Sequence, residues 1–179
     1  PGMTVINPSD GVSAKKLLEQ AVAMEGPCYV RLGRAKVPVF YEDSDQLTLG
    51  KGNLVRDGKD VTIVATGIMV SEAMAAAEKL KEDGVDARII DIHTIKPIDE
   101  EILIKAAQET GAIVTAEEHS IIGGLGSAVA EVIVKNCPVK MAMVGQKDTY
   151  GESGKPDELK KKYGMTAEDI EAAVKNLIG

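Results

Sequence analysis

The chain has 179 residues, a formal net charge of -7, 44% hydrophobic residues and 3% aromatic residues. This length suits one ordinary domain, or one domain with part of another, and the apolar share is sufficient for a buried core. The negative charge and the scarcity of aromatic rings exclude a typical nucleic-acid partner, which requires a basic surface and stacking platforms. No apolar run approaches the roughly 20 residues of a membrane-spanning helix, so no membrane partner is predicted.

The N-terminal segment and the two cysteines indicate the cellular compartment in which the protein is expected. The stretch "PGMTVINPSD" has no charged region followed by an apolar one, so it does not look like a signal peptide. Cys28 and Cys137 are too few and too far apart for a metal knuckle or a disulfide framework. We therefore expect a cytoplasmic protein with two reduced, buried thiols. Because Pro1 closely precedes a predicted strand, we expect either a fragment of a longer protein or the trimming of a few residues.

The first 45 residues predict a strand, a helix and a second strand. "MTVIN" (3–7) is typical of a short strand, and Asp10 suits the N-cap of a helix that Gly26-Pro27 ends. The apolar face of this helix is expected to include Leu17, Leu18, Ala21 and Val22. "CYVRL" (28–32) is the next strand. Residues 33–60 are rich in Gly, Pro and Asp without helical periodicity, which predicts a linker with a short strand near residues 47–49.

From residue 61 onward, β-branched runs alternate regularly with helical patterns. Buried strands are predicted at 61–66, 87–92, 112–118 and 139–145. Helices are predicted at 69–82, from Asp99 to Gly111, at about 126–135, from Pro156 to Gly164, and from a capping box at Thr166 and Asp169 to about residue 178. This alternation is typical of an α/β fold in which helices cover a parallel sheet.

The predicted elements divide the chain into three parts. Residues 1–45 form an incomplete βαβ piece, residues 46–60 a linker, and residues 61–179 a whole α/β domain. The first piece is too short to bury a core by itself, so we expect it to pack on the second domain or on chain that is not present.

The stretch "EEHSIIGGLG" (117–126) combines two carboxylates, a histidine and a glycine cluster, which makes it a candidate functional site. Gly124 and Gly126 match the first two glycines of a dinucleotide fingerprint, but Val129 stands where the third small residue is required. We therefore reject a dinucleotide site. The free N–H groups at the start of the following helix remain a candidate for binding an anion, although glycines at helix starts more often serve backbone geometry.

His119 is a candidate general base, with Glu117 or Glu118 to orient it. Adjacent side chains of an extended segment point to opposite sides, however, and no G-x-S-x-G nucleophile motif is present. The other histidine, His93, lies at a different strand end, so no zinc ligand set converges. We interpret His119 as bonded to loop backbone or placed at a subunit contact, and assign no catalytic or metal-binding residue. The candidates for an anion or subunit contact are His119, Gly124, Gly126 and Ser127.

The stretch "RLGR" places Arg31 and Arg34 at and just after the end of a strand. Ligands approach an open α/β sheet at the carboxyl ends of its strands, and a planar guanidinium binds phosphate through two hydrogen bonds. The alternative is a solvated or ion-paired arginine. Residue chemistry alone leaves both interpretations open.

Several longer stretches resemble the C-terminal part of transketolase, most closely the split type in which this half is a separate subunit. They cover nearly the whole chain: "GPCYVRLGR", "GKGNLVRDGKDVTIVATGIMVSEAMAAAEKL", "IDIHTIKPIDEEIL", "TAEEHSIIGGLGSAVAE" and "YGESGKPDELKKKYGMT". Deoxyxylulose-phosphate synthase and the beta subunits of 2-oxo acid dehydrogenases share the domain. "LGR" is similar to the "LSR" of transketolases and "YGES" to their "FGES", which favours transketolase.

The resemblance implies a mostly parallel five-stranded sheet flanked by helices, preceded by the tail of a pyrimidine-binding domain. It also implies a thiamin diphosphate enzyme with Mg²⁺ that moves two-carbon ketol units between sugar phosphates. The family's catalytic and metal-binding residues lie upstream, so this chain alone is expected to be inactive and to bind no cofactor.

Further implications concern residues and partners. The family's phosphate-binding arginine matches Arg34, although Gly33 and Ala35 stand where the family has Ser and Gln. The implied partners are an N-terminal transketolase half, a second copy in a dimer, and a sugar phosphate. The alternatives are a fragment of deoxyxylulose-phosphate synthase and a non-catalytic dimerisation or regulatory module.

Overall fold

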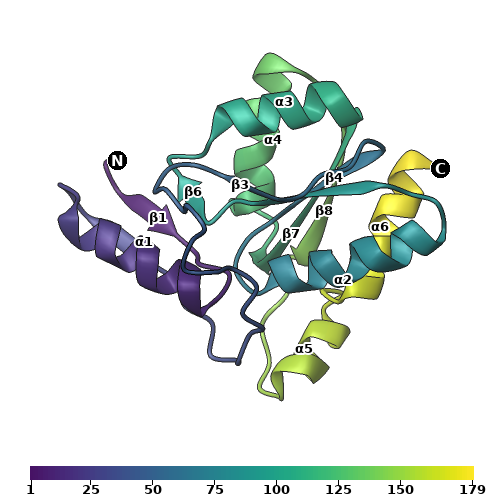
Figure 1. Ribbon diagram of the computed structural model, residues 1–179. Coiled ribbons are helices and arrows are strands. Elements are labelled where there is room, and N and C mark those ends of the chain that lie inside the picture. The colour runs from purple at the N-terminus through teal and green to yellow at the C-terminus, as the bar shows by residue number, and fades with distance from the viewer.

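The computed structural model describes residues 1–179, which form two sheets surrounded by helices (Figure 1). The smaller sheet has the strand order β2-β1-β6. Strands β1 (Thr4–Ile6) and β2 (Cys28–Val30) are parallel and are joined by helix α1 (Gly11–Ala23), which confirms the predicted βαβ piece. Strand β6 (Thr94–Lys96) comes from the second part of the chain and runs antiparallel to β1.

The larger sheet has the order β3-β5-β4-β7-β8. Its strands are β3 (Asn53–Arg56), β5 (Ala87–Asp91), β4 (Val61–Ala65), β7 (Ala112–Ser120) and β8 (Lys140–Gln146). All neighbours are parallel except β3, which is antiparallel to β5. The mostly parallel five-stranded sheet is therefore confirmed. Every residue of β4 and β5 is buried, because helices cover both faces of the sheet.

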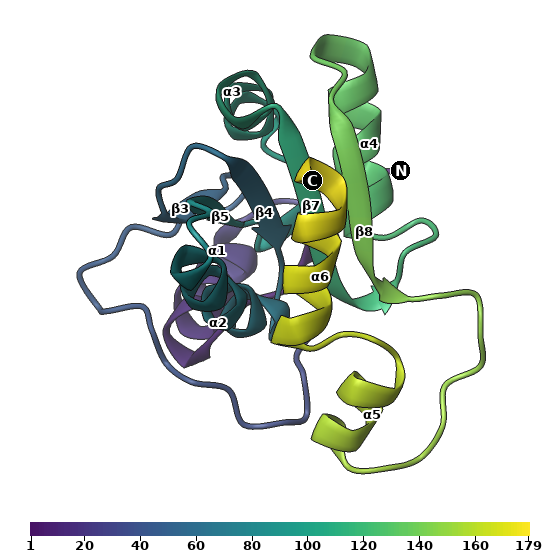
Figure 2. The same ribbon diagram turned by 90° about the vertical axis from the view of Figure 1, so that its right-hand side faces the viewer.

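Two pairs of helices provide this cover (Figures 1 and 2). Helices α2 (Met69–Glu82) and α6 (Ala167–Ile178) pack on one face, and α3 (Glu100–Thr110) and α4 (Leu125–Asn136) pack on the other. The short helix α5 (Pro156–Lys162) lies outside these layers. The longest helix has 14 residues, and no helix of the structure is long and apolar enough to cross a membrane.

The N-terminal piece is attached to the larger domain by hydrogen bonds of both main chain and side chains. The backbone N–H of Asn7 donates to the His93 carbonyl oxygen at 2.8 Å, beside the β1–β6 pairing. Ser9 Oγ donates to the Asp91 carboxylate at 2.6 Å, and Tyr41 OH donates to the same oxygen at 3.1 Å. The piece thus packs on the second domain, as its small size led us to expect.

Two helix caps agree with the sequence. The Asp10 carboxylate accepts the Ser13 amide at 2.7 Å, and the Thr166 amide donates to Asp169 at 2.9 Å. Asp10 also accepts the Phe40 and Tyr41 amides, at 3.1 and 2.9 Å, so the same carboxylate holds the following loop against α1.

Some local predictions were wrong. No strand forms at 47–49; β3 forms at Asn53–Arg56 instead, because this segment pairs with the edge of β5. Strand β6 was missed, since three residues are too few to show a period. Strand β7 continues to Ser120, which pairs with Gln146 of β8.

The burial of two groups also differs from expectation. Val22 is 86% exposed and Leu18 is 38% exposed, because only the Leu17 side of α1 contacts the rest of the chain. Cys28 and Cys137 are free thiols, as predicted, but they are half-buried.

Candidate functional site

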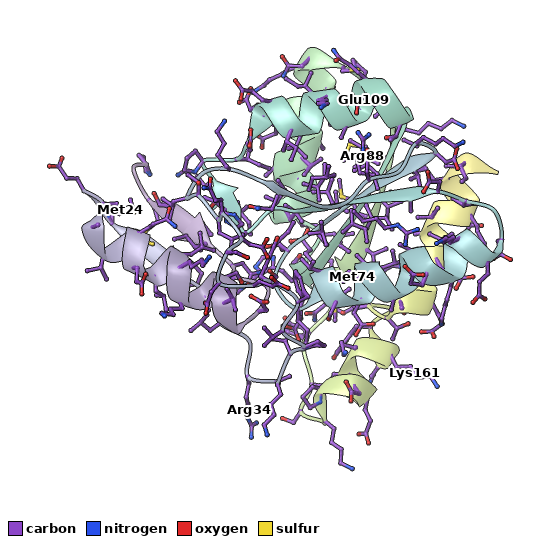
Figure 3. The ribbon with its side chains drawn as sticks, in the orientation of Figure 1. Met24, Arg34, Met74, Arg88, Glu109 and Lys161 are labelled. Carbon is purple, nitrogen blue, oxygen red and sulfur yellow. The ribbon has the colours of Figure 1, made fainter.

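Strand β2 ends in a loop that carries two arginines. The Arg31 amide still donates to the Ile6 carbonyl oxygen at 2.9 Å, which continues the pairing of β1 and β2 by one residue. The chain then leaves the sheet, and Arg34 is exposed. Figure 3 shows its side chain extending away from the body of the molecule. The loop therefore presents a guanidinium to solvent at the carboxyl end of a parallel strand, where ligands approach α/β sheets.

The four arginines of the chain differ in their partners. Arg56 is paired with Glu78, and Arg88 is paired with both Asp57 and Glu109. Arg34, by contrast, pairs with no carboxylate of the chain. Its charge is therefore available to an external anion, which the sequence alone could not establish.

Arg31 is held by a side chain instead. The side-chain amide of Asn7 is oriented by its neighbours. Its oxygen accepts from Arg31 Nη2 at 2.8 Å, and its nitrogen donates to the Arg31 carbonyl oxygen at 3.2 Å. A guanidinium only donates and a carbonyl oxygen only accepts, so these partners determine which amide atom faces which. The two arginines of "RLGR" thus have different roles.

Glu117, in the last part of β7, organises the connection from this strand to α4. Its side chain is 1% exposed, and its carboxylate accepts the Leu125 amide at 2.7 Å and the Gly126 amide at 2.8 Å. These are the first amides of α4, which carry the positive end of the helix dipole. A carboxylate of the chain itself therefore occupies the Gly126 amide that was a candidate for an external anion.

The glycines of this loop allow close packing. A Cβ at Gly126 would lie 2.8 Å from Met143 Sδ and 2.9 Å from Thr115 Oγ1, and a Cβ at Gly124 would collide with the Glu117 carboxylate. Gly126 is buried, so it provides a close approach of α4 to the sheet. Val129 is buried in the core on the same side, consistent with the rejection of a dinucleotide site.

His119 lies near the end of β7, and its side chain is 45% exposed. Its Nδ1 is 2.9 Å from the Ser120 carbonyl oxygen, and because a carbonyl oxygen only accepts, Nδ1 is the donor of this hydrogen bond. The Glu117 carboxylate is 3.8 Å away and is already occupied by two amides. In the structure His119 therefore bonds to neighbouring backbone, and a subunit contact at this residue stays a prediction.

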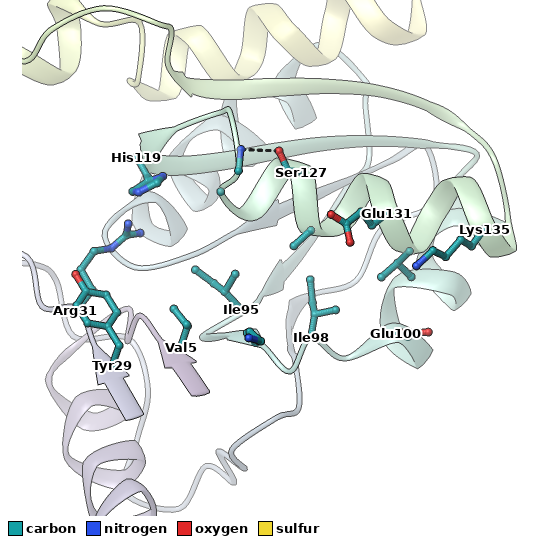
Figure 4. Close-up of a pocket in the computed structure, with 15 residues that line it drawn as sticks. Val5, Tyr29, Arg31, Ile95, Ile98, Glu100, His119, Ser127, Glu131 and Lys135 are labelled. Atoms are coloured by element: carbon teal, nitrogen blue, oxygen red, sulfur yellow. Dashed lines mark hydrogen bonds between the residues drawn. The ribbon is translucent and has the colours of Figure 1, made fainter. Parts of the chain in front are cut away.

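A cavity of about 520 Å³ lies between the N-terminal piece and α4, and Figure 4 shows its walls. Tyr29 and Arg31 stand on one side, Ile95 and Ile98 on the floor, and Lys135 at the far end. Three of the four residues predicted for an anion or subunit contact line it: His119, Gly124 and Ser127. The hydroxyl of Ser127 accepts the Gly123 amide at 2.9 Å and donates to the Ile121 carbonyl oxygen, so it is engaged within the loop.

Two further titratable side chains are fully buried near the junction of the two parts. Burial lowers the pKa of His93 to about 4, so its ring is neutral near pH 7; it contacts Thr94 Oγ1 and Asn53 Oδ1. Burial raises the pKa of Asp91 to about 7, against the hydrogen bonds from Ser9 and Tyr41 that lower it. Nowhere do three His, Cys, Asp or Glu side chains gather as ligands for a metal ion.

Comparison with known proteins decides the family. Residues 50–170 match the family model described as "Transketolase, C-terminal domain". The chain belongs to the transketolase family. It is 49% identical over 170 residues to a 6-deoxy-6-sulfo-D-fructose transketolase subunit of Clostridium sp. (strain MSTE9), covering 95% of this chain and 53% of that protein. It is 47% identical over 173 residues to a putative transketolase C-terminal section of Methanocaldococcus jannaschii, covering 95% and 54%.

A solved structure agrees with this assignment. A split-gene transketolase, described as an inactive β4 tetramer, superposes with a TM-score of 0.96 at 47% identity, covering 99% of this chain and 58% of that one. The resemblance to the C-terminal part of transketolases, and the fold it implied, are thus confirmed. The chain spans about half the length of the subunits and sections it matches, and 29% of mouse transketolase.

Sequence reasoning missed the roles of two residues, Asn7 and Glu117, that organise these regions of the transketolase chain. Asn7 is a single amide after a short strand, and no spacing rule connects it to Arg31. The capping role of Glu117 had a weak signal, because a carboxylate eight residues before the start of a helix suggests only a partner for the nearby His119.

Proposed function

We propose that this chain is the C-terminal portion of a thiamin diphosphate-dependent transketolase that transfers two-carbon ketol units between sugar phosphates. In this proposal Arg34 binds the substrate phosphate. The supporting observation is its exposed guanidinium, which has no carboxylate partner in the chain and stands at the carboxyl end of β2. A guanidinium holds a phosphate through two parallel hydrogen bonds, which fixes the orientation of the sugar as well as its position.

The names of two relatives are consistent with an anion site. One is a transketolase of 6-deoxy-6-sulfo-D-fructose, and another, 43% identical over 171 residues, is an apulose-4-phosphate transketolase from Phocaeicola vulgatus. Each name describes a sugar with a sulfonate or a phosphate group. Both groups present several oxygens to a planar set of N–H donors, so one arginine suits either of them.

The cofactor and the remaining substrate contacts are proposed to come from an N-terminal transketolase half. When bound there, thiamin diphosphate supplies the carbanion chemistry that carries the two-carbon unit. The residues of this chain bind and orient the substrate anion. We further propose residues 1–45 as the pyrimidine-domain tail, residues 46–60 as a linker that contributes β3 to the larger sheet, and residues 61–179 as the C-terminal domain of a cytoplasmic enzyme.

The surface formed by His119, Gly124 and Ser127 is proposed as a subunit contact. These residues line an open cavity and lie next to the exposed apolar side chain of Ile122. A dimer that covered this surface would place two copies of the loop close together. The inactive β4 tetramer of the similar structure is consistent with self-association of this half, and with our proposal that the isolated chain is inactive.

The proposed phosphate role is tested by Arg34→Ala in the enzyme assembled from this chain and an N-terminal transketolase half. Loss of charge-assisted hydrogen bonds should raise KM for a phosphorylated sugar by roughly 10- to 100-fold. The unphosphorylated counterpart should change far less. Lys36→Ala is the matched control, because it removes an exposed cation two residues further along the same loop. Equal losses for both sugars with Arg34→Ala would remove the phosphate role.

The proposed division of labour is tested by titration calorimetry of this chain with thiamin diphosphate and Mg²⁺. We expect no heat of binding from the chain alone and binding after the N-terminal half is added. Micromolar binding by the chain alone would contradict the assignment of the cofactor to the other half.

A further inference from the structure

Asn7 lies where three segments of the chain meet. It follows β1 directly and is only 6% exposed. Its backbone N–H donates to the His93 carbonyl oxygen at 2.8 Å. Its own carbonyl oxygen accepts from Thr66 Oγ1 at 3.3 Å, at the carboxyl end of β4. The backbone of Asn7 is therefore anchored to the larger domain on two sides.

The Asn7 side chain bonds both the guanidinium and the backbone carbonyl oxygen of Arg31. The amide oxygen accepts from the Arg31 guanidinium at 2.8 Å, and the amide nitrogen donates to the Arg31 carbonyl oxygen at 3.2 Å. Together with the hydrogen bond from the Arg31 amide to Ile6, this restrains the backbone N–H, the backbone carbonyl and the side chain of Arg31. One side chain thus holds the residue at which the loop leaves the sheet.

The turn between β4 and α2 prevents Asn7 from moving away. Gly67 has a φ of +58°, and a Cβ there would lie 2.6 to 2.9 Å from the atoms of the Asn7 amide. The Asn7 side-chain amide thus packs directly against Gly67, where no larger residue would fit. Because packed interiors tolerate little displacement, the amide is held in contact with Arg31.

Only Leu32 and Gly33 separate Arg31 from Arg34. On its other side the loop passes Glu118, whose carboxylate lies 4.0 Å from the position of a Cβ at Gly33. A displacement of Arg31 would therefore shift the chain only three residues before Arg34. Functional groups need to be held within about 0.5 Å by supporting residues to keep productive geometry.

We infer that Asn7 is a positioning residue that holds Arg31, and through Arg31 the loop that presents Arg34 to the substrate anion. This inference rests on the proposed function, since it requires Arg34 to bind that anion. It also assigns Arg31 to support of the loop, because its guanidinium is directed into the Asn7 amide.

The test is a double-mutant cycle with Asn7→Ala, Arg34→Ala and the double variant, in the enzyme assembled with an N-terminal transketolase half. Asn7→Ala should raise KM for a phosphorylated sugar by roughly tenfold, with less than a twofold effect on its unphosphorylated counterpart. In the Arg34→Ala background, Asn7→Ala should raise KM no further, because the group that it positions is gone.

A conservative variant separates positioning from general damage. Asn7→Asp keeps an oxygen for the Arg31 guanidinium and loses the donor to the Arg31 carbonyl, so KM should recover to within about threefold of the wild type. If Asn7→Ala does not fold, Asn7→Thr takes its place in the cycle, because its side chain is smaller but remains polar. Far-ultraviolet circular dichroism and unfolding midpoints identify which variants are folded.

The outcomes are distinguishable from failure of the proposed function. If Arg34→Ala shows no phosphate-selective loss, the phosphate role itself is wrong, whatever Asn7 does. If Arg34→Ala is selective but the effects of the two substitutions multiply, Asn7 acts independently of Arg34 and the inference is overturned. Equal losses for both sugars with Asn7→Ala would also overturn it, because they indicate a purely structural role.

Discussion

The loop after β7 and the loop after β2 both follow the carboxyl end of a parallel strand, yet they use their polar groups in opposite ways. In the first region, which begins with the last residues of β7, the Glu117 carboxylate accepts the first amides of α4, and His119 bonds to a neighbouring carbonyl oxygen. In the loop after β2, Arg31 is held by Asn7 and Arg34 is left exposed. The stretch from Glu117 to Gly126 thus uses the Glu117 carboxylate and His119 Nδ1 on its own backbone, whereas the loop after β2 leaves the Arg34 guanidinium to a ligand.

This difference shows that the number of titratable residues in a stretch is a poor guide to a binding site. A buried carboxylate beside a helix start satisfies backbone donors that otherwise cost free energy, so its role is structural. A cation without a partner has lost little solvation and keeps its capacity to bind. The comparison can be tested at Glu117 and His119, and at Asp91, where β5 ends against the N-terminal piece.

The largest effect is expected for Glu117→Ala. It would leave the buried amides of Leu125 and Gly126 without acceptors, and the loss of these charge-assisted hydrogen bonds should lower the free energy of unfolding by about 3 kcal/mol. Urea unfolding measures this change. Glu117→Gln, which retains one acceptor oxygen, is the matched control and should lose about half as much. A loss below about 1 kcal/mol for Glu117→Ala would show that the loop does not depend on its own carboxylate.

An intermediate effect is expected at Asp91, where β5 ends against the N-terminal piece. One carboxylate oxygen of Asp91 accepts from Ser9 and Tyr41, while the other is buried without a partner. Burial first, and then the negative charge of Asp10, raises the pKa of Asp91. The folded chain holds the proton up to about pH 7, whereas the unfolded chain releases it near pH 3.8. Stability from this group is therefore complete below pH 3.8 and is lost as pH rises toward 7.

Asp91→Asn should remove this dependence, because an amide does not ionise. Between pH 5 and 7 the wild type should lose stability relative to the variant by up to about 1.4 kcal/mol per pH unit, which urea unfolding at several pH values measures. Parallel pH profiles for the two proteins would mean that Asp91 is ionised throughout this range, like an ordinary carboxylate.

The smallest effect is expected for His119→Ala. The side chain is half-exposed and bonded only to loop backbone, so unfolding free energy should change by less than about 0.5 kcal/mol. In the assembled enzyme kcat should change less than about threefold, whereas loss of a general base lowers it by roughly 100-fold or more. A loss of that size would make the loop after β7 the reactive one and reverse the comparison.

Much of the fold was predictable because its signals are local. The apolar period of residues 69–82, the β-branched runs of β4 and β5, and the Thr166–Asp169 cap each report contacts within a few residues of the chain. Strands β3 and β6 were missed or misplaced because they are short edge segments. Their conformation depends on β5 and β1, which lie far away in sequence.

The sequence by itself determined the alternation of strands and helices, the family, and Arg34 as the matching arginine. The tertiary structure decided which polar groups are free, by bringing Glu117 to the amides of α4 and Asn7 to Arg31 across 24 residues of sequence. The physical reason is that hydrogen-bond satisfaction depends on distance and direction in space. A sequence specifies these only through the complete packing of the fold.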